Sequence, residues 1–268
     1  MTWLFNPTQP EMIKNSYYYE EEKPPEILKK NVSLFYQFKI LETSSGFLPV
    51  IPDGCVDLLF CFDSAKPFAV VATSPLQRCT YEFRKDADYF GVRFYPEQGS
   101  LKFQCSLKEL LHHQQIPLFD AFTFHPSILE ELAEQTTLND RIMWFTSFLT
   151  SINYEGNYDL NLTNFCLNKI YSSQGSMSVK QLSSITGYTD RYIRKKFDQY
   201  IGFSPKEFCQ IVRLQKSIHQ LLEFSKNIED QTVDDLGFFD KSHFYKEFKK
   251  YMSITPKEYK NLFLYQDQ

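Results

Sequence analysis

The chain has 268 residues, of which 43% are hydrophobic and 23% are charged, and its formal net charge is −4. This length favours two domains, and the composition is typical of a soluble globular protein. The sequence has neither an apolar run long enough to cross a bilayer nor an N-terminal leader pattern, so we expect a cytoplasmic protein without a membrane role.

Charge is distributed unevenly along the chain. The segment from Leu167 to the C-terminus contains 16 Lys and Arg residues against 12 Asp and Glu residues, whereas the preceding segment contains 13 against 21. Charge separated in this way indicates that two domains have different partners. The C-terminal part is therefore suited to a polyanion such as nucleic acid, and the N-terminal part is not.

The N-terminal part is predicted to be rich in β-strands. Short apolar and aromatic runs are bounded there by Pro, Gly and Asp residues, which is typical of strands joined by turns. We therefore predict an antiparallel sheet or a small barrel. The Asp53-Gly54 dipeptide is a turn or bulge signal inside the second run. The predicted strand runs are Ser33 to Leu41, Phe47 to Phe62, Phe68 to Ala72, and Cys79 to Tyr95.

Helical spacing replaces the strand pattern after Gly99. The predicted helices cover Leu101 to Leu111, Pro126 to Leu132, and Leu138 to Leu149. In the last of them, Ile142, Phe145 and Leu149 share one face, which is expected to pack on the sheet.

A linker is predicted between the two parts. The segment from Ser151 to Asn161 is polar, contains glycine and has no periodicity, which places the boundary within about five residues of Asn157. We therefore expect an α+β protein with a β-rich domain and trailing helices over residues 1–156. An all-α domain is expected over residues 157–268.

No group of side chains in the sequence predicts catalysis, a cofactor or a metal. Asp53, Asp57 and Glu82 have no nucleophile or partnered acid–base pair and are interpreted as turn and surface residues. His112 and His113 have no partners at metal-ligand spacing. The cysteines form no C-x-x-C pair and are interpreted as reduced thiols in or near the core. These cysteines are Cys55, Cys61, Cys79, Cys105, Cys166 and Cys209.

The first of two similar helical units begins near residue 179. Val179, Leu182 and Ile185 have the spacing of apolar positions in a short helix. Gly187 is expected to end that helix in a tight turn, and Thr189 to cap the next helix.

The second helix of this unit is predicted over Asp190 to Tyr200, with Ile193 and Phe197 buried. Its remaining face is basic and available to DNA if an adjoining helix supports it. That face carries Arg191, Arg194 and Lys195.

A second unit follows with a similar layout. Val233 and Leu236 precede Gly237, and Asp240 is the expected cap of the next helix. The outer face of that helix is polar or basic. It carries Lys241, Ser242, His243, Lys246, Lys249 and Lys250.

The two units form a degenerate internal repeat. Phe244 and Phe248 repeat the spacing of the buried pair in the first unit, and residues 204–208 (SPKEF) align with residues 255–259 (TPKEY). The period is about fifty residues, the size of one supersecondary unit with a connecting helix.

One long helix is predicted to join the units, over residues 206–224. Two recognition helices that enter successive major-groove segments on one DNA face lie roughly 34 Å apart, and a helix of this length can hold two units at a fixed separation. Its apolar surface comes from Phe208, Ile211, Val212, Leu214, Ile218, Leu221 and Leu222.

The segment from about Val179 to Lys260 resembles the DNA-binding domain of the AraC/XylS family of transcription regulators. The resemblance rests on the GYT…F…GFSP block, on Arg213-Leu214 in the joining helix, and on GFFDKSHFYKEF…TPKEY near the end. The N-terminal part resembles the sensory domains attached to some of these regulators, through IPDGCVDLLF and FGVRFYPEQG.

The resemblance implies that the second helix of each unit enters the major groove. Arg and Lys donate hydrogen bonds to guanine O6 and N7, and hydroxyl and ammonium groups also bind phosphate. His243 is expected to contact phosphate or to pack. Thr232 and Val233 depart from the isoleucine and alanine usual in the family, so the helix pair of the second unit is expected to have a slightly altered angle. The implied DNA contacts are Arg191, Arg194, Lys195, Lys241, Ser242 and Lys246.

Three functions remain open from the sequence. The favoured one is a regulator of transcription, as an activator or a repressor, controlled by an effector or partner at the N-terminal domain. The second is a constitutive DNA binder whose N-terminal domain only dimerises. The third is an enzyme that uses the helical domain for docking, although no catalytic constellation supports it. Candidate partners are double-stranded DNA, RNA polymerase, a small-molecule effector and a second copy of the chain.

Overall fold

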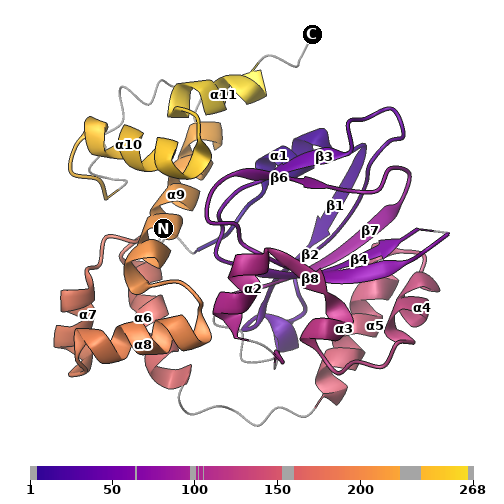
Figure 1. Ribbon diagram of the computed structural model, residues 1–268, viewed down its shortest axis with the longest axis horizontal. Helices are drawn as coiled ribbons and strands as arrows, with labels where there is room; N and C mark the ends of the chain where they lie inside the picture. Colours follow the sequence, from indigo (N-terminus) through magenta and orange to yellow (C-terminus); the bar gives the residue numbers. More distant parts are fainter. Residues whose placement is uncertain are drawn as a thin grey trace.

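The computed structural model describes residues 5–63, 65–96, 101, 103–104, 106–152, 160–223 and 237–264. A β-rich part and an all-helical part lie side by side, and the helix α9 runs through the helical part from one group of helices to the other (Figure 1). This arrangement confirms the α+β class.

The main sheet is antiparallel and six-stranded, with the order β1-β2-β7-β4-β5-β8. A separate two-stranded sheet pairs β3 with β6. The strands are β1 (Tyr18–Glu22), β2 (Val32–Lys39), β3 (Phe47–Val50), β4 (Val56–Phe62), β5 (Phe68–Thr73), β6 (Cys79–Glu82), β7 (Asp88–Phe94) and β8 (Gln115–Pro117).

Two of the four predicted strand runs are broken by turns. The run from Phe47 divides into β3 and β4 around Gly54, whose φ of 75° lies in the left-handed region. The run from Cys79 divides into β6 and β7, and Asp86 between them has a φ of 55°. The sequence did not predict β1, which reads YYEEE, or the three-residue β8, because neither has an alternating apolar pattern.

Helices α2 to α5 come after β7 in the chain, with β8 between α2 and α3, and a core of the N-terminal part lies between these helices and one face of the main sheet. Phe145 of α5 contacts Phe35, Phe60 and Phe90 of three adjacent strands edge to face. The face of α5 that buries Ile142, Phe145 and Leu149 is the predicted one. The helices are α2 (Leu107–His113), α3 (Leu118–Ala121), α4 (Ile128–Ala133) and α5 (Leu138–Ser151).

The opposite face of the main sheet packs on the small sheet and on α1 (Pro10–Asn15). Aromatic rings fill this second layer, where Phe38 and Tyr89 stack at 4.8 Å and Phe83 meets both rings edge to face. The layer is therefore a packed aromatic core rather than an open barrel.

The predicted helix from Leu101 is shorter than expected, because α2 begins only at Leu107 after its cap Ser106.

The helical part has two small cores that share α9. The first core gathers α6, α7, α8 and the N-terminal half of α9, and the second gathers the C-terminal half of α9, α10 and α11. The helices are α6 (Leu160–Ser172), α7 (Val179–Thr186), α8 (Asp190–Tyr200), α9 (Pro205–Glu223), α10 (Lys241–Met252) and α11 (Pro256–Leu264).

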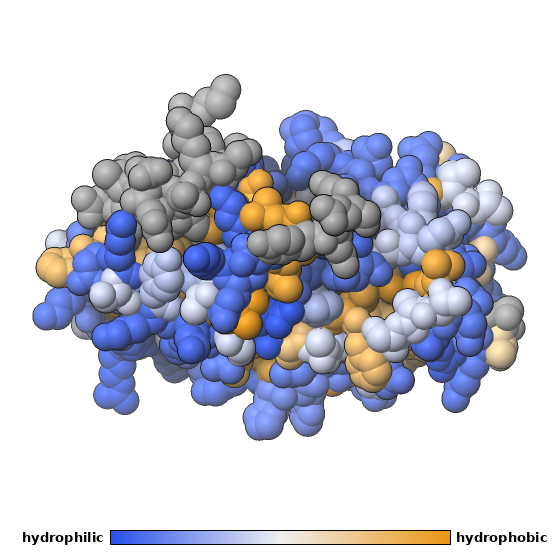
Figure 2. Space-filling model, turned by 90° about the horizontal axis from the view of Figure 1, so that it is seen from above, coloured by the Kyte–Doolittle hydropathy of each residue, from blue (hydrophilic) through white to orange (hydrophobic). Residues whose placement is uncertain are grey.

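Most side chains on the face seen in Figure 2 are hydrophilic, and the apolar ones form separate patches. Within the described part of the chain, no helix has the length and apolar character to cross a membrane. Four of the five cysteines described there are buried and one is half-buried, all as free thiols, as the sequence predicted. Cys105 and the predicted boundary near Asn157 lie outside the described residues.

Candidate nucleic-acid interface

The first unit has a helix-turn-helix geometry built from local signals. Helix α7 ends at Gly187, which adopts the left-handed φ of 73° and donates its N–H to Ser183 O. The Thr189 side chain then accepts the N–H of Tyr192 and starts α8. Of the predicted apolar positions in α7, Leu182 is buried, whereas Ile185 is 49% exposed.

Helix α8 separates an apolar face from a basic face. Ile193 and Phe197 are buried in the first core, as predicted. The structure places the predicted contact residues Arg191, Arg194 and Lys195 together on the exposed face of the same helix. They follow the i, i+3, i+4 spacing, so their side chains can enter one groove together.

The next cation in α8, Lys196, belongs to a different environment. It is only 9% exposed, and its ammonium lies 5.5 Å from the ring centre of Tyr192 and 5.4 Å from that of Tyr200. Lys195 and Lys196 are adjacent in the helix and therefore lie on different faces, so one is exposed and the other is buried.

The described part of the second unit repeats this arrangement. The Asp240 side chain accepts the N–H of His243 at 2.7 Å and caps α10. Phe244 and Phe248 are buried, as predicted. The preceding helix predicted around Val233 and Leu236 lies outside the described residues. The exposed first turns of α10 carry Lys241, Ser242, His243 and Lys246.

His243 packs against protein groups. Its ring lies edge to face on Phe238 at 5.6 Å, and its Nε2 is 3.8 Å from Glu247 Oε2. These contacts agree with a packing role, although 48% of the side chain stays exposed.

The repeated SPKEF and TPKEY segments are capping boxes. Ser204 N–H donates to Glu207 Oε2, and Glu207 N–H donates back to Ser204 Oγ. Thr255 and Glu258 make the same reciprocal pair at the start of α11, and these hydrogen bonds lower the pKa of Glu258. The proline after each cap fits the first helical position. The repeat therefore marks where α9 and α11 begin.

A buried ion pair joins the two units. The Arg213 guanidinium of α9 binds both carboxylate oxygens of Glu247 in α10, at 2.8 and 3.0 Å from Nη2. Its Nη1 donates to Gly175 O, between α6 and α7, at 2.6 Å. Its flat face lies 5.3 Å from the ring centre of Phe238. One side chain of the joining helix thus contacts both the turn that precedes the first unit and helix α10 of the second unit.

No local pattern in the sequence predicts this ion pair. Arg213 and Glu247 are 34 residues apart, and only the resemblance drew attention to Arg213. Side chains of the pair are 12% and 6% exposed, so the two charges stabilise each other out of water.

The N-terminal part contacts both helical cores. Phe5 stacks on Tyr171 at 4.8 Å and meets Phe208 at 6.1 Å inside the first core. Ile51 belongs to the second core. A side chain at Gly54 would place its Cβ 2.8 Å from the Phe208 ring. The predicted Asp53-Gly54 turn is therefore also a close contact between the two parts of the chain.

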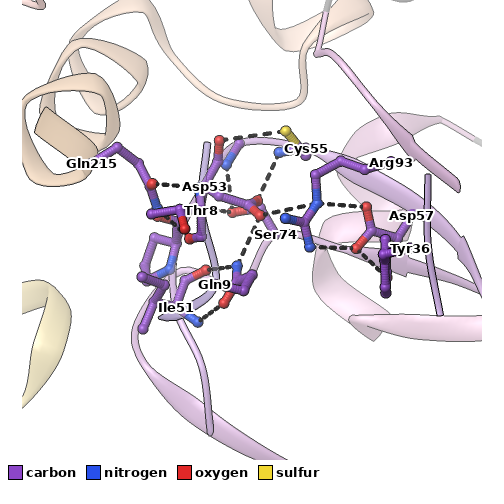
Figure 3. A network of polar contacts seen from close by, with 12 residues as sticks. Thr8, Gln9, Tyr36, Ile51, Asp53, Cys55, Asp57, Ser74, Arg93 and Gln215 are labelled. Atoms are coloured by element: carbon purple, nitrogen blue, oxygen red, sulfur yellow. Dashed lines mark hydrogen bonds and ion pairs between the residues drawn. The ribbon is translucent and has the colours of Figure 1, made fainter. Parts of the chain in front are cut away.

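A polar network extends from α9 into the sheet (Figure 3). Gln215 of α9 accepts Thr8 N–H at 2.9 Å and donates to Pro52 O at 2.8 Å. On the other side of this turn, Gln9 donates to Asp53 Oδ2 at 2.8 Å.

Asp53 lies in the predicted turn, but the interpretation of Asp53 and Asp57 as surface residues is wrong, and Asp57 lies in strand β4 rather than in a turn. Asp53 is 3% exposed, and Asp57 is half-buried and faces Arg93 as its partner in the β4–β7 register. Arg93 binds both Asp57 oxygens at 3.0 and 2.9 Å, and its Nε lies 3.7 Å from Asp53 Oδ2. Burial raises the pKa of Asp53, and Arg93 opposes that shift. Glu82 is exposed, as predicted.

A groove of about 1170 Å³ runs between α2 and α8. One wall carries Arg191, Arg194 and Lys195 of α8, and Lys108 and Leu111 of α2 lie across from them. Lys108 Nζ and Asp198 Oδ1 are 2.9 Å apart, and the Leu111 side chain contacts the turn at Gly202. The N-terminal part thus stands beside the exposed basic face of α8.

Comparison with protein families gives two matches in this chain. A helix-turn-helix domain family matches residues 182–261, and a domain of unknown function (DUF6597) matches residues 20–117. The first match contains α8, α9 and α10 with all the predicted DNA contacts.

Two curated relatives are similar to part of this chain. An uncharacterized HTH-type transcriptional regulator of Escherichia coli, YidL, is 32% identical over 85 residues, which is 32% of this chain and 28% of YidL. One from Haemophilus influenzae is 28% identical over 87 residues, covering 32% of this chain and 29% of the relative. The matched region is less than a third of each relative's length.

Among solved structures, ToxT from Vibrio cholerae is 12% identical, with a TM-score of 0.43 over 91% of this chain and 97% of ToxT. A fatty-acid-bound form of ToxT is 13% identical, with a TM-score of 0.42 over 90% and 93% of the two chains.

Proposed function

We propose that the chain is a transcription regulator that binds two adjacent major-groove segments, because residues 182–261 match a helix-turn-helix domain family and carry the motifs that resemble the AraC/XylS family. In this proposal residues 157–268 form the DNA-binding domain and residues 1–156 the controlling domain. The protein acts in the cytoplasm, and its further partners are RNA polymerase, an effector and a second copy of the chain.

The carrying observation is that two exposed basic helix faces are attached to one rigid helix. Helix α9 has 19 residues, so it spans about 28 Å at 1.5 Å per residue. Successive major-groove segments on one face of B-DNA are roughly 34 Å apart. A spacer of this length supports simultaneous insertion of α8 and α10.

Each recognition helix supplies chemically suitable groups. Arg191 and Arg194 can donate paired hydrogen bonds to guanine, and Lys195 can donate to guanine or phosphate. In α10, the side chains of Lys241, Ser242 and Lys246 lack the paired donors of arginine. They suit contacts with phosphate and single hydrogen bonds to bases.

Control by the N-terminal domain is the second part of the proposal. The contacts of the N-terminal domain with both helical cores hold α8 beside α2. A DNA duplex whose major groove receives α8 must therefore also avoid a clash with α2. A ligand or partner that favours a different docking of the two parts would change the fraction of molecules able to bind DNA.

Binding to a mixed-sequence duplex tests the polyanion contact without knowledge of the operator. The affinity of the full-length protein should fall steeply as salt rises, because bound lysines and arginines release counterions. The double variant Lys241→Ala, Lys246→Ala should bind DNA more weakly. The slope of log affinity against log salt concentration should become shallower, by the equivalent of up to about two phosphate contacts. A folded protein that shows no affinity for any duplex at low salt contradicts the proposal.

A further inference from the structure

An apolar side chain stands at the tip of the second recognition helix. Phe239 is 89% exposed, more than any other large hydrophobic side chain in the described part of the chain. It directly precedes Asp240, the cap of α10, and is followed by Lys241 and Ser242.

Local packing holds Phe239 in this outward position. The neighbouring Phe238 is 4% exposed and packs against Phe244 at 5.1 Å and against the Arg213 guanidinium. The inward site is thus already filled by Phe238. Phe239 N–H also donates to His243 Nδ1 at 3.5 Å, which ties the backbone to the first turn of α10.

The first unit has an aromatic residue at the same place. Tyr188 directly precedes the cap Thr189 and is 48% exposed. Its ring stacks on Tyr192 at 5.1 Å. In α10 the corresponding position is His243, whose ring packs on Phe238 instead. The ring of Phe239 is therefore presented outward more fully than that of Tyr188.

The occupant of this site follows from the chemistry of the major groove. The N-terminal residues of a recognition helix lie nearest the base edges. The thymine methyl is the apolar group displayed in the major groove, and a phenylalanine ring is a suitable contact for it. Lys241, two residues further along the chain, provides a positive charge that can interact with the DNA phosphates.

We propose that Phe239 contacts a thymine C5-methyl in the second DNA element and makes the protein prefer thymine at that position. This inference rests on the proposed function, because it requires α10 to enter the groove. It adds a hydrophobic specificity residue to the polar contacts predicted from the sequence.

The test uses full-length protein and the site that wild-type protein enriches from random duplexes. Each thymine of the second element is replaced singly by deoxyuridine, which lacks only the methyl. One replacement should weaken wild-type binding about fourfold, the effect of losing one buried methyl contact. The same replacement should leave binding by Phe239→Ala unchanged. Phe47→Ala, at an exposed aromatic residue of β3, serves as the control and should behave as wild type.

The outcomes separate the inference from the proposed function. A second selection with Phe239→Ala should lose the thymine preference at one position only, and Phe239→Leu should keep part of it. If a two-element site is enriched but wild type and Phe239→Ala respond equally to every deoxyuridine, the inference is wrong and the proposed function stands. If wild-type protein enriches no site, the proposed function fails first.

Discussion

Two adjacent lysines in α8 differ in what they can do. Lys195 is on the exposed basic face, whereas Lys196 is buried between two tyrosine rings. Helical rotation of about 100° per residue places neighbours on different faces. The apolar positions Ile193 and Phe197 fix this rotation, which is why the sequence predicted the exposed set correctly.

Arg194→Ala is expected to weaken binding to the selected site by roughly 1–3 kcal/mol and to relax base preference at one position. The reason is that a guanidinium on the groove-facing side loses its paired hydrogen bonds to a base. Binding assays on the selected site and on single-base variants measure both effects. Lys169→Ala, an exposed lysine on α6, is the control and should change neither. An equal loss on all sequences would show that Arg194 contacts only phosphate.

Arg93→Met is expected to lower the free energy of unfolding by about 3–5 kcal/mol at neutral pH. The change leaves the carboxylates of Asp53 and Asp57 without the guanidinium that both now face. Urea unfolding of variant and wild type gives the difference. Arg84→Met, at a partly exposed ion pair with Asp63, should cost no more than about 1 kcal/mol.

The pH dependence of this difference identifies its cause. Burial already raises the pKa of Asp53, and loss of Arg93 should raise it further. Protonation then relieves the unpaired charge, so the stability gap between wild type and variant should narrow as pH falls from 7 toward about 4. A gap independent of pH would mean that lost packing, and not lost charge pairing, causes the destabilisation.

At the scale of elements, local signals in the sequence predict the helices of the two units, whereas the features that were not predicted depend on long-range contacts. Caps at Thr189 and Asp240 and the turn at Gly187 are each encoded within a few residues, so α8 and α10 could be predicted. The pairing of Asp57 with Arg93 depends on sheet register across 36 residues, which no local pattern specifies.

The Arg213–Glu247 ion pair is expected to set the relative position of the two recognition helices. Arg213→Lys should lower the free energy of unfolding by about 1.5–3 kcal/mol, because lysine cannot make the paired hydrogen bonds. It should also broaden the range of spacings between the two DNA elements that the protein accepts. Selection from pools with fixed spacings measures this range.

Arg84→Lys, at the partly exposed ion pair with Asp63, is the matched control for Arg213→Lys. It should alter neither stability nor spacing preference. If Arg213→Lys lowers stability while the accepted spacing stays as narrow as in wild type, the ion pair stabilises the fold without positioning α10.

At the scale of the whole molecule, the sheet part and the helical part share cores. Phe5 lies in the first helical core and Ile51 in the second. Charge asymmetry in the sequence predicted different partners for the two parts but could not predict these contacts, since they join residues more than 150 positions apart.

Leu111→Ser is expected to increase the DNA affinity of the full-length protein. Leu111 of α2 packs against the first helical core and touches the turn after α8, so the change should weaken the docking that places α2 beside the recognition helix. Equilibrium binding to the selected site measures the effect. His113→Ser, at an exposed position on the same helix, is the control. Unchanged or reduced affinity of a folded Leu111→Ser protein would show that α2 does not restrict access to α8.

The most direct test is selection of bound sequences from random duplexes at a fixed salt concentration, with wild-type and Leu111→Ser proteins in parallel. We expect one enriched site with two elements about one helical turn apart, roughly 10 base pairs from centre to centre. If both proteins enrich only a single element, or if neither enriches any site, the proposal that the protein binds two adjacent major-groove segments is contradicted.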